Sequence, residues 1–145
     1  MGFMDAMEIL SSSLAASRTR MNLISSNLAN AQTTRSAEGG PYRRKDPVYE
    51  ATPIDRPFSD MLQDRMGDAA RGVKVSAVVT DPRPPRTVYD PRHPDADANG
   101  IVKMPNVNVV EEMVDMITAS RAYEAGITAM QSIKSMANKA LSIGK

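Results

Sequence analysis

The sequence predicts an α+β chain in which two long terminal α-helices (N and C) pair as a coiled coil, with a small proline-rich β region inserted between them. All ten prolines lie between Pro41 and Pro105, so both ends can form uninterrupted helices. Both ends repeat apolar residues at heptad spacing, whereas the middle alternates apolar and polar residues as strands do. We therefore divide the chain into an N-terminal helix (1–32), a β-rich central region (33–106) and a C-terminal helix (107–145), with the two helices forming one helical domain.

The N-terminal segment, from about Phe3 to Ala31, carries a sustained heptad pattern. Apolar residues spaced alternately by four and three predict a helix that pairs with another helix along a narrow seam. Asp5 and Glu8 lie near the start of this helix, where negative charge is favoured by the helix dipole. The seam positions are Phe3, Met7, Leu10, Leu14, Ser17, Met21, Ile24, Leu28 and Ala31.

Four short runs in the central region predict strands: 46–54, 72–80, 86–90 and 100–104. The second run, GVKVSAVVT, places valine or alanine at every second position, so Val73, Val75, Ala77 and Val79 would share one face of a strand. The polar stretch 60–72 predicts a short helix or a mobile loop. Punctuation of the region by proline and aspartate favours short strands over helices.

Residues 95–106, DADANGIVKMPN, resemble the first half of an EF-hand calcium loop. However, Asn106 occupies position 12, where an EF-hand needs a bidentate glutamate, and prolines upstream prevent an entering helix. We interpret the stretch as a turn, because Asn99 and Gly100 both tolerate positive φ. A calcium-regulated binding protein stays as an alternative hypothesis.

The C-terminal segment, from about Val109 to Ile143, repeats the heptad design. Asn108 can cap its start, Glu111 stands three residues later as in a capping box, and Gly144 is the expected C-cap. Gly126 inside the helix should cost about 1 kcal/mol relative to alanine. The seam positions are Val109, Met113, Met116, Ser120, Tyr123, Ile127, Met130, Ala137 and Leu141.

The composition excludes several classes of function. With 18 basic and 17 acidic residues in 145, the chain lacks the basic excess that nucleic-acid binding needs. It has no cysteine and one histidine, His93, so thiol catalysis and multi-ligand metal sites of those residues are excluded. We interpret His93 as a surface loop residue and RRK (43–45) as a solvated strand end, and we expect no enzyme, cofactor or metal site. No run reaches the length of a transmembrane helix, and the N-terminus lacks the pattern of a cleavable secretory signal.

Two helices of this length carry more apolar surface than a small β region can cover. Exposed apolar strips of that size mark association surfaces, and eight of the eleven methionines lie in the two end segments. Methionine suits interfaces that accept several slightly different neighbours. The sequence therefore predicts an assembling building block whose seams are buried between subunits. A freestanding coiled-coil adaptor or chaperone-like interaction module is the alternative from another class.

Several stretches resemble the bacterial flagellar rod and hook family. SSNLANAQTT (25–34) resembles the N-x-A-N-x-x-T motif near the N-terminus of that family. GGPYRRKDPV (39–48), the long run YDPRHPDADANGIVKMPNVNVVEEMVDMITASRAYEA (89–125) and the final SMANKALSIGK are similar to subunits of the proximal rod. The resemblance spans the whole chain, although the 60–72 stretch matches no motif and the family pattern favours a better helix former at Gly126.

The resemblance implies a structural subunit that stacks helically into the flagellar proximal rod, the tubular drive shaft that crosses the periplasm. It implies that the paired helices line the inner wall, that the central region points outward, and that subunits leave the cell through the flagellar type III export apparatus without a cleavable signal peptide. The implied partners are copies of the chain itself, the other proximal-rod proteins, the rod–basal-body junction protein and the distal-rod protein. Nucleic acid is not among them.

The family motifs add polar residues to the apolar seams as candidates for the assembly interface. The N-terminal motif contributes Asn27, Asn30 and Thr33, and the PNVN stretch and the start of the C-terminal helix contribute the rest. The complete candidate interface is Phe3, Met7, Leu10, Leu14, Met21, Ile24, Asn27, Leu28, Asn30, Thr33, Asn106, Asn108, Val109, Glu111, Glu112, Met113, Met116, Tyr123, Ile127, Met130, Ala137 and Leu141.

Overall fold

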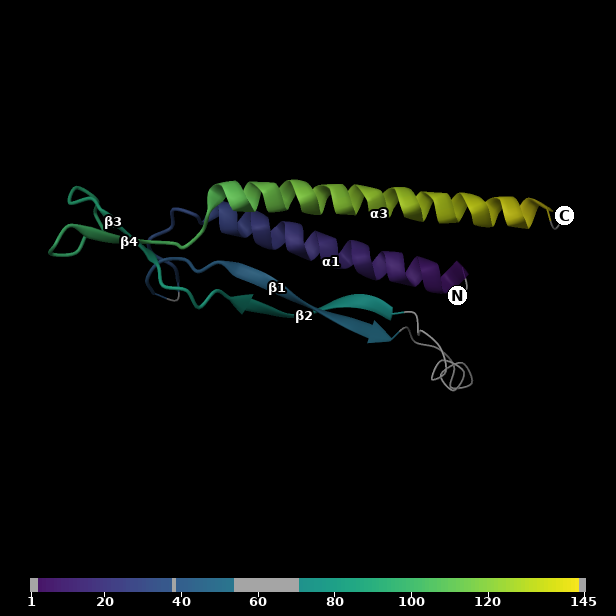
Figure 1. Cartoon of the computed structure of the whole chain (residues 1–145), viewed down its shortest axis with the longest axis horizontal. Helices are drawn as coiled ribbons and strands as arrows, with labels where there is room; N and C mark the ends of the chain where they lie inside the picture. The colour runs from purple at the N-terminus through teal and green to yellow at the C-terminus, as the bar shows by residue number, and fades with distance from the viewer. Residues whose placement is uncertain (1–2, 38, 54–70, 144–145) are drawn as a thin grey trace.

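The N-terminal helix forms the middle layer of the fold (Figure 1). The computed structural model describes residues 3–37, 39–53 and 71–143. Helix α1 (Phe3–Ala29) lies between helix α3 (Val109–Ile143), which packs along one side of it, and a ribbon of two strands on its other side. The expected pair of long terminal helices with a small β region between them is thus confirmed.

Strands β1 (Lys45–Pro53) and β2 (Arg71–Thr80) pair antiparallel to form the ribbon. The register shifts between Val48 and Tyr49, where an irregularity interrupts the ladder. A two-stranded ribbon is marginally stable on its own. Packing against α1 is therefore what holds this ribbon in place.

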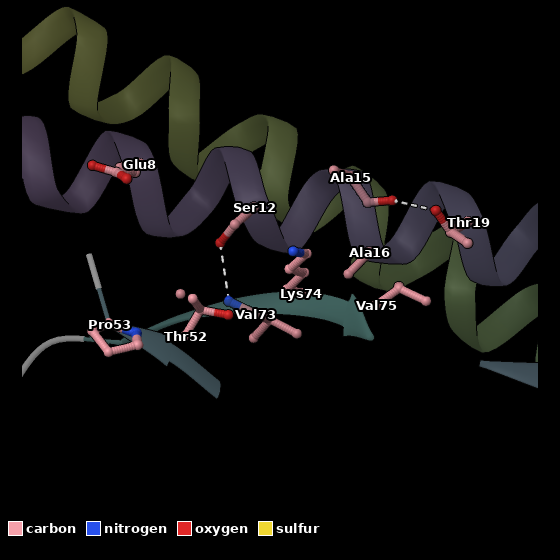
Figure 2. Close-up of a pocket in the computed structure, with 11 residues that line it drawn as sticks. Glu8, Ser12, Ala15, Ala16, Thr19, Thr52, Pro53, Val73, Lys74 and Val75 are labelled. Atoms are coloured by element: carbon pink, nitrogen blue, oxygen red, sulfur yellow. Dashed lines mark hydrogen bonds between the residues drawn. The ribbon is translucent and has the colours of Figure 1, made fainter. Parts of the chain in front are cut away.

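Small residues allow the ribbon to approach α1 closely. The Ser12 hydroxyl accepts a hydrogen bond of 3.2 Å from the Val73 amide, which extends the strand's hydrogen bonding onto the helix (Figure 2). A Cβ atom added at Gly72 would lie 3.0 Å from the Ser12 Oγ. Glycine at this position thus allows helix and strand backbones to meet without a clash.

A second antiparallel hairpin, β3 (Arg86–Tyr89) with β4 (Ile101–Met104), lies beyond the end of the helix pair that is remote from both termini (Figure 1). Its loop is tied back by Asp95, whose carboxylate accepts a 2.7 Å hydrogen bond from Thr34 and pairs with Arg35 at 2.6 Å. The Thr34 hydrogen bond is the main reason why the pKa of Asp95 lies below its ordinary value.

The turn before β4 differs from the expected one. Gly100 has a φ of 75°, as expected, but no described residue other than glycine has positive φ, so Asn99 does not. Asp97 closes the turn instead, because its Oδ1 accepts hydrogen bonds from the amides of Asn99 and Ile101 at 2.8 and 2.9 Å. The calcium hypothesis needs the carboxylates of Asp95 and Asp97 as metal ligands. In the fold Asp97 instead closes this side-chain turn, and Asp95 bonds to Thr34 and Arg35.

The element boundaries agree with most of the predicted ones. All four strands lie within one residue of their expected limits over the described part of the chain. Asn108 caps α3, since its Oδ1 accepts a 3.1 Å hydrogen bond from the Val110 amide. Gly144 and most of the 60–72 stretch lie outside the described residues. None of the described helices has the length and apolar composition that crossing a membrane requires.

The core is small, and its largest buried side chains are partly polar. The buried apolar residues are Ala16, Ile24, Ala31, Val102, Val107 and Ala119. Asn27 is 1% exposed and Glu112 is 0% exposed, which places an amide and a carboxylate among the most buried groups of the described chain. Buried polar groups are tolerated only when they are hydrogen-bonded, so their contacts show how the layers are held together.

Candidate assembly interface

Asn27 of α1 uses its whole amide to join three elements. Its Nδ2 donates to the Lys45 carbonyl at 3.0 Å and to Glu112 Oε2 at 3.1 Å. Its Oδ1 accepts from the Lys45 amide at 2.9 Å and from the Tyr42 hydroxyl at 2.9 Å. The side chain therefore pairs with the N–H and the C=O of the first residue of β1, much as a neighbouring strand would, and reaches α3 as well.

Arg44 supplies the positive charge that balances Glu112. Its Nε donates to Glu112 Oε1, and its other nitrogens pair with Asp46 and, at 3.7 Å, with Asp115. Burial alone lowers the pKa of Arg44. The hydrogen bond and charge of Glu112, together with the charges of Asp46 and Glu111, outweigh this, so that the pKa of the guanidinium is raised above its ordinary value. The interpretation of RRK as a solvated strand end is thus wrong for Arg44, whose side chain is 15% exposed.

We call the group Asn27, Tyr42, Arg44 and Glu112 the polar junction. Every buried side-chain nitrogen or oxygen in the described chain has a hydrogen-bond partner, so the junction is a fully satisfied network. Such networks specify one arrangement of the elements they join. Arg20 adds a second link between the helices through its 3.1 Å ion pair with Asp115.

The other motif residues shape the chain around the junction. Asn30 donates a 2.9 Å hydrogen bond to the Ser26 carbonyl at the end of α1, and Thr33 donates to Asn30 Oδ1 at 3.2 Å. The Thr33 carbonyl then accepts from the Tyr42 amide at 3.0 Å. These contacts turn the chain from α1 towards β1 and so position Tyr42 and Arg44.

A line of buried and half-buried residues on α3 alternates by four and three along the helix. We call this line the inner seam: Glu112, Met116, Ala119, Tyr123, Gly126, Met130, Ile133 and Ala137. It faces α1, since Glu112 bonds to Asn27 and a Cβ added at Gly126 would lie 2.9 Å from a methyl group of Leu14. Two of its small members, Ala119 and Gly126, make room for α1.

The predicted seam of α3 is therefore partly wrong as a surface facing α1. Met116, Tyr123, Met130 and Ala137 belong to the inner seam, whereas Val109, Met113, Ile127 and Leu141 are exposed in the single chain. A pattern of large apolar residues selects these four, because it leaves out charged positions such as Glu112 and small ones such as Gly126. A paired charge and a close helix approach are what occupy those positions in the fold.

The predicted interface residues differ widely in exposure. Ile24, Asn27 and Glu112 are buried in the single chain, so the motif residues Asn27 and Glu112 hold its elements together. The half-buried members are Met7, Leu10, Leu14, Met21, Leu28, Asn30, Thr33, Asn106, Met116, Tyr123, Met130 and Ala137. The exposed members are Phe3, Asn108, Val109, Glu111, Met113, Ile127 and Leu141. Contact of any of them with another subunit stays a prediction.

Gly126 provides the first test of the inner seam. Replacing Gly126 with leucine should lower the free energy of unfolding by about 1–3 kcal/mol, the usual cost of overpacking, because the added side chain meets Leu14. Chemical denaturation monitored by circular dichroism measures this change. The double variant Gly126→Leu/Leu14→Ala should recover part of the loss. A stabilised Gly126→Leu variant would contradict the close approach, since higher helix propensity would then dominate.

A patch of exposed apolar side chains runs along the first turns of α3. Val110, Met113, Val114 and Ile117 are 70, 54, 57 and 53% exposed, respectively. We call these four residues the outer stripe. Ile117 precedes Gly126 by about two and a half turns, so the stripe lies on the side of α3 away from α1. Of the four, only Met113 belongs to the seam that the sequence predicts.

The face becomes polar beyond the stripe. Arg121, Glu124 and Thr128 follow Ile117 along the same side of α3 and are exposed. Among the described elements, α3 packs only against α1. The stripe is thus an apolar surface with a defined end, and nothing described in the single chain covers it.

Comparison with known proteins identifies the family. A family model described as "Flagella basal body rod protein" matches residues 7–35, and one described as "Flagellar basal body rod FlgEFG protein C-terminal" matches residues 98–143. These segments include α1 with its motif and the β4–α3 region with Glu112. The two matches thus cover both elements that the polar junction joins to β1.

Curated relatives match over nearly the whole chain. The flagellar basal-body rod protein FlgC of Borreliella burgdorferi is 43% identical, over 99% of this chain and 98% of the relative. FlgC of Bacillus subtilis is 44% identical over 97% of each chain, and FlgC of Salmonella typhimurium is 41% identical over 100% of both. The chain belongs to the FlgC family of flagellar basal-body rod proteins, and it is a structural rod subunit and not an enzyme.

Proposed function

We propose that the chain builds the proximal rod by using its helices twice. Within a subunit, α1 and α3 pair as a coiled coil along the inner seam. Between subunits, the outer stripe of α3 packs against a neighbour. The observation that carries this proposal is the exposure of the stripe, because contiguous exposed apolar surface marks a site of association.

The coiled-coil part of the proposal is supported by the spacing of the inner seam. Alternation by four and three along α3 is the heptad spacing, and the packing of a Leu14 methyl group against Gly126 is how a knob enters a hole in a coiled coil. At about 1.5 Å per residue, the 35 residues of α3 extend over roughly 50 Å. A rod wall built from such pairs would be one helix pair thick.

The position of the β elements suggests the orientation of the subunit. Both termini lie at one end of the helix pair, and the β3–β4 hairpin lies at the other (Figure 1). We place the helix pair along the inner wall of the rod in the periplasm, with the β region pointing outward. The proposed neighbours are copies of the chain, the other proximal-rod proteins, the rod–basal-body junction protein and the distal-rod protein. The subunit would reach them through the flagellar type III export apparatus.

Substitutions in the outer stripe test the proposal. In a strain whose own gene is deleted, a chain with Met113→Asp and Ile117→Asp should accumulate in the cell but fail to restore swimming, because charged groups cannot be buried unpaired at a subunit contact. Electron cryotomography should show basal bodies without a completed rod. The matched control, Thr128→Asp, changes the same side of α3 beyond the stripe and should swim normally. Normal rods from the doubly substituted chain would overturn the role of the stripe.

A further inference from the structure

A groove opens between α1 and β2, on the far side of α1 from α3. It has a volume of about 360 Å³, and Ser12, Ala16, Val73 and Val75 are among the residues that line it. Figure 2 shows Lys74 between Val73 and Val75, beneath the stretch of α1 from Ser12 to Ala16. The groove is thus a largely apolar concavity, and two charged residues, Glu8 and Lys74, also line it.

We infer that this groove receives the outer stripe of α3 from a second copy of the chain. The inference rests on the proposed function and names the surface that the stripe contacts. Val110, Met113, Val114 and Ile117 stand at positions i, i+3, i+4 and i+7. That spacing is how an amphipathic helix presents anchors to an apolar groove. The outer stripe and the groove are therefore both largely apolar.

The outer stripe and the groove lie on opposite sides of one molecule. On α1, Ser12 faces the ribbon and Leu14 faces α3; residues two apart on a helix are turned by about 200° from each other. On α3, the outer stripe faces away from α1. A contact between two different surfaces is heterologous, so each added copy presents a new free groove or a new free stripe. Such a contact builds a closed ring or an open helix according to the rotation between copies, and a helically stacked rod needs the open helix.

Charges at the edges of the two surfaces select one orientation. Glu8 and Lys74 lie at the groove, whereas Glu111 and Arg121 flank the outer stripe, and all four are exposed. None of them forms a side-chain hydrogen bond or an ion pair with another described residue. Lys74 lies nearer than Glu8 to the C-terminal end of α1 (Figure 2).

If the incoming α3 runs antiparallel to α1, then Glu111 approaches Lys74 and Arg121 approaches Glu8. The parallel orientation would place like charges together instead, which is unfavourable. Within one chain α3 is also antiparallel to α1 (Figure 1). Copies stacked with the same polarity would therefore present α3 to the groove in the orientation that the charges favour.

Disulfide cross-linking tests this docking directly, because the natural chain has no cysteine. In the antiparallel orientation, Ile117 of the incoming copy lies near the level of Ser12 and Val73. A purified full-length chain with Ile117→Cys and Val73→Cys, concentrated and oxidised, should form a ladder of linked copies. The two sites cannot join within one chain, because α1 separates α3 from β2 and a disulfide needs Cα atoms roughly 4.4–6.8 Å apart.

Matched pairs serve as controls. Thr128→Cys with Val73→Cys moves the first thiol beyond the stripe, and Ile117→Cys with Val78→Cys moves the second to the far part of the ribbon. Both should give little linkage, and each single-cysteine variant should give at most a dimer. Adding Glu111→Lys to the reactive pair should lower the yield of linked copies several-fold, and adding Lys74→Glu as well should restore it.

The results separate this inference from the proposed function. Equal yields from the reactive pair and the controls, or no linked copies at all, would overturn the docking in the groove. The outer stripe would still act in assembly if the stripe-substituted chain failed to build rods in cells. Conversely, normal rods from that variant would overturn the proposed function, whatever the cross-linking showed. A charge reversal that leaves the yield unchanged would overturn the antiparallel pairing.

Discussion

Replacing Arg44 with methionine should lower the free energy of unfolding by about 3–5 kcal/mol, the usual cost of removing one partner from a buried ion pair. Methionine keeps much of the aliphatic stem, so the loss comes from the charge. Glu112, which is 0% exposed, would keep its carboxylate with Asn27 as its remaining partner. Urea denaturation followed by circular dichroism measures the change.

The neighbour Arg43 provides the control for Arg44. Its side chain is exposed, so Arg43→Met should change the free energy of unfolding by less than about 0.5 kcal/mol. Adding Glu112→Met to Arg44→Met should recover much of the loss, because an apolar pair of similar volume can replace a buried ion pair. Equal effects of the Arg43 and Arg44 substitutions would show that the junction does not stabilise the fold.

Asn27→Leu should cost about 2–6 kcal/mol of the free energy of unfolding, because two backbone groups lose their partner and each buried unpaired group costs about 1–3 kcal/mol. Those groups are the N–H and the C=O of Lys45. Leucine fills a similar volume, so a cavity does not explain the loss. Hydrogen exchange at the Lys45 amide should accelerate in this variant, which a general loss of packing elsewhere would not single out.

Asn22, exposed on the same helix, is the matched control for Asn27. Asn22→Leu should leave both the unfolding free energy and the exchange of Lys45 nearly unchanged. A double-mutant cycle with Glu112→Leu separates the direct bond from the backbone contacts, because residues in one network give non-additive changes. Strict additivity of Asn27→Leu and Glu112→Leu would argue against their coupling.

Local patterns predict the elements of this fold well. Heptad spacing, the confinement of proline to the middle and alternation in runs such as GVKVSAVVT depend on neighbours along the chain, and each leads to the observed helix or strand. Asn108 is correctly predicted as a cap because capping also depends on adjacent residues. The outline of the molecule is therefore readable from sequence alone.

The side of α3 that faces α1 is harder to predict. Apolar count assigns the seam to Met113 and Ile127, whereas the structure uses Glu112, Ala119 and Gly126. A buried glutamate is compatible with a seam only when a distant arginine pairs with it, and no pattern within α3 reveals Arg44. Gly126 is unfavourable inside a helix, and this cost indicates a close contact with another element. That contact is Leu14, which lies more than a hundred residues away in the chain.

The polar junction also bears on when the subunit can fold. It joins Asn27 to Lys45 and to Glu112, and Asn27 and Glu112 lie 85 positions apart in the chain. We propose that the subunit passes through a narrow export channel as an unfolded chain. In that case the polar junction cannot form until most of the chain has left the channel. The chain would thus stay unfolded during export and fold only beside the growing end of the rod that it extends.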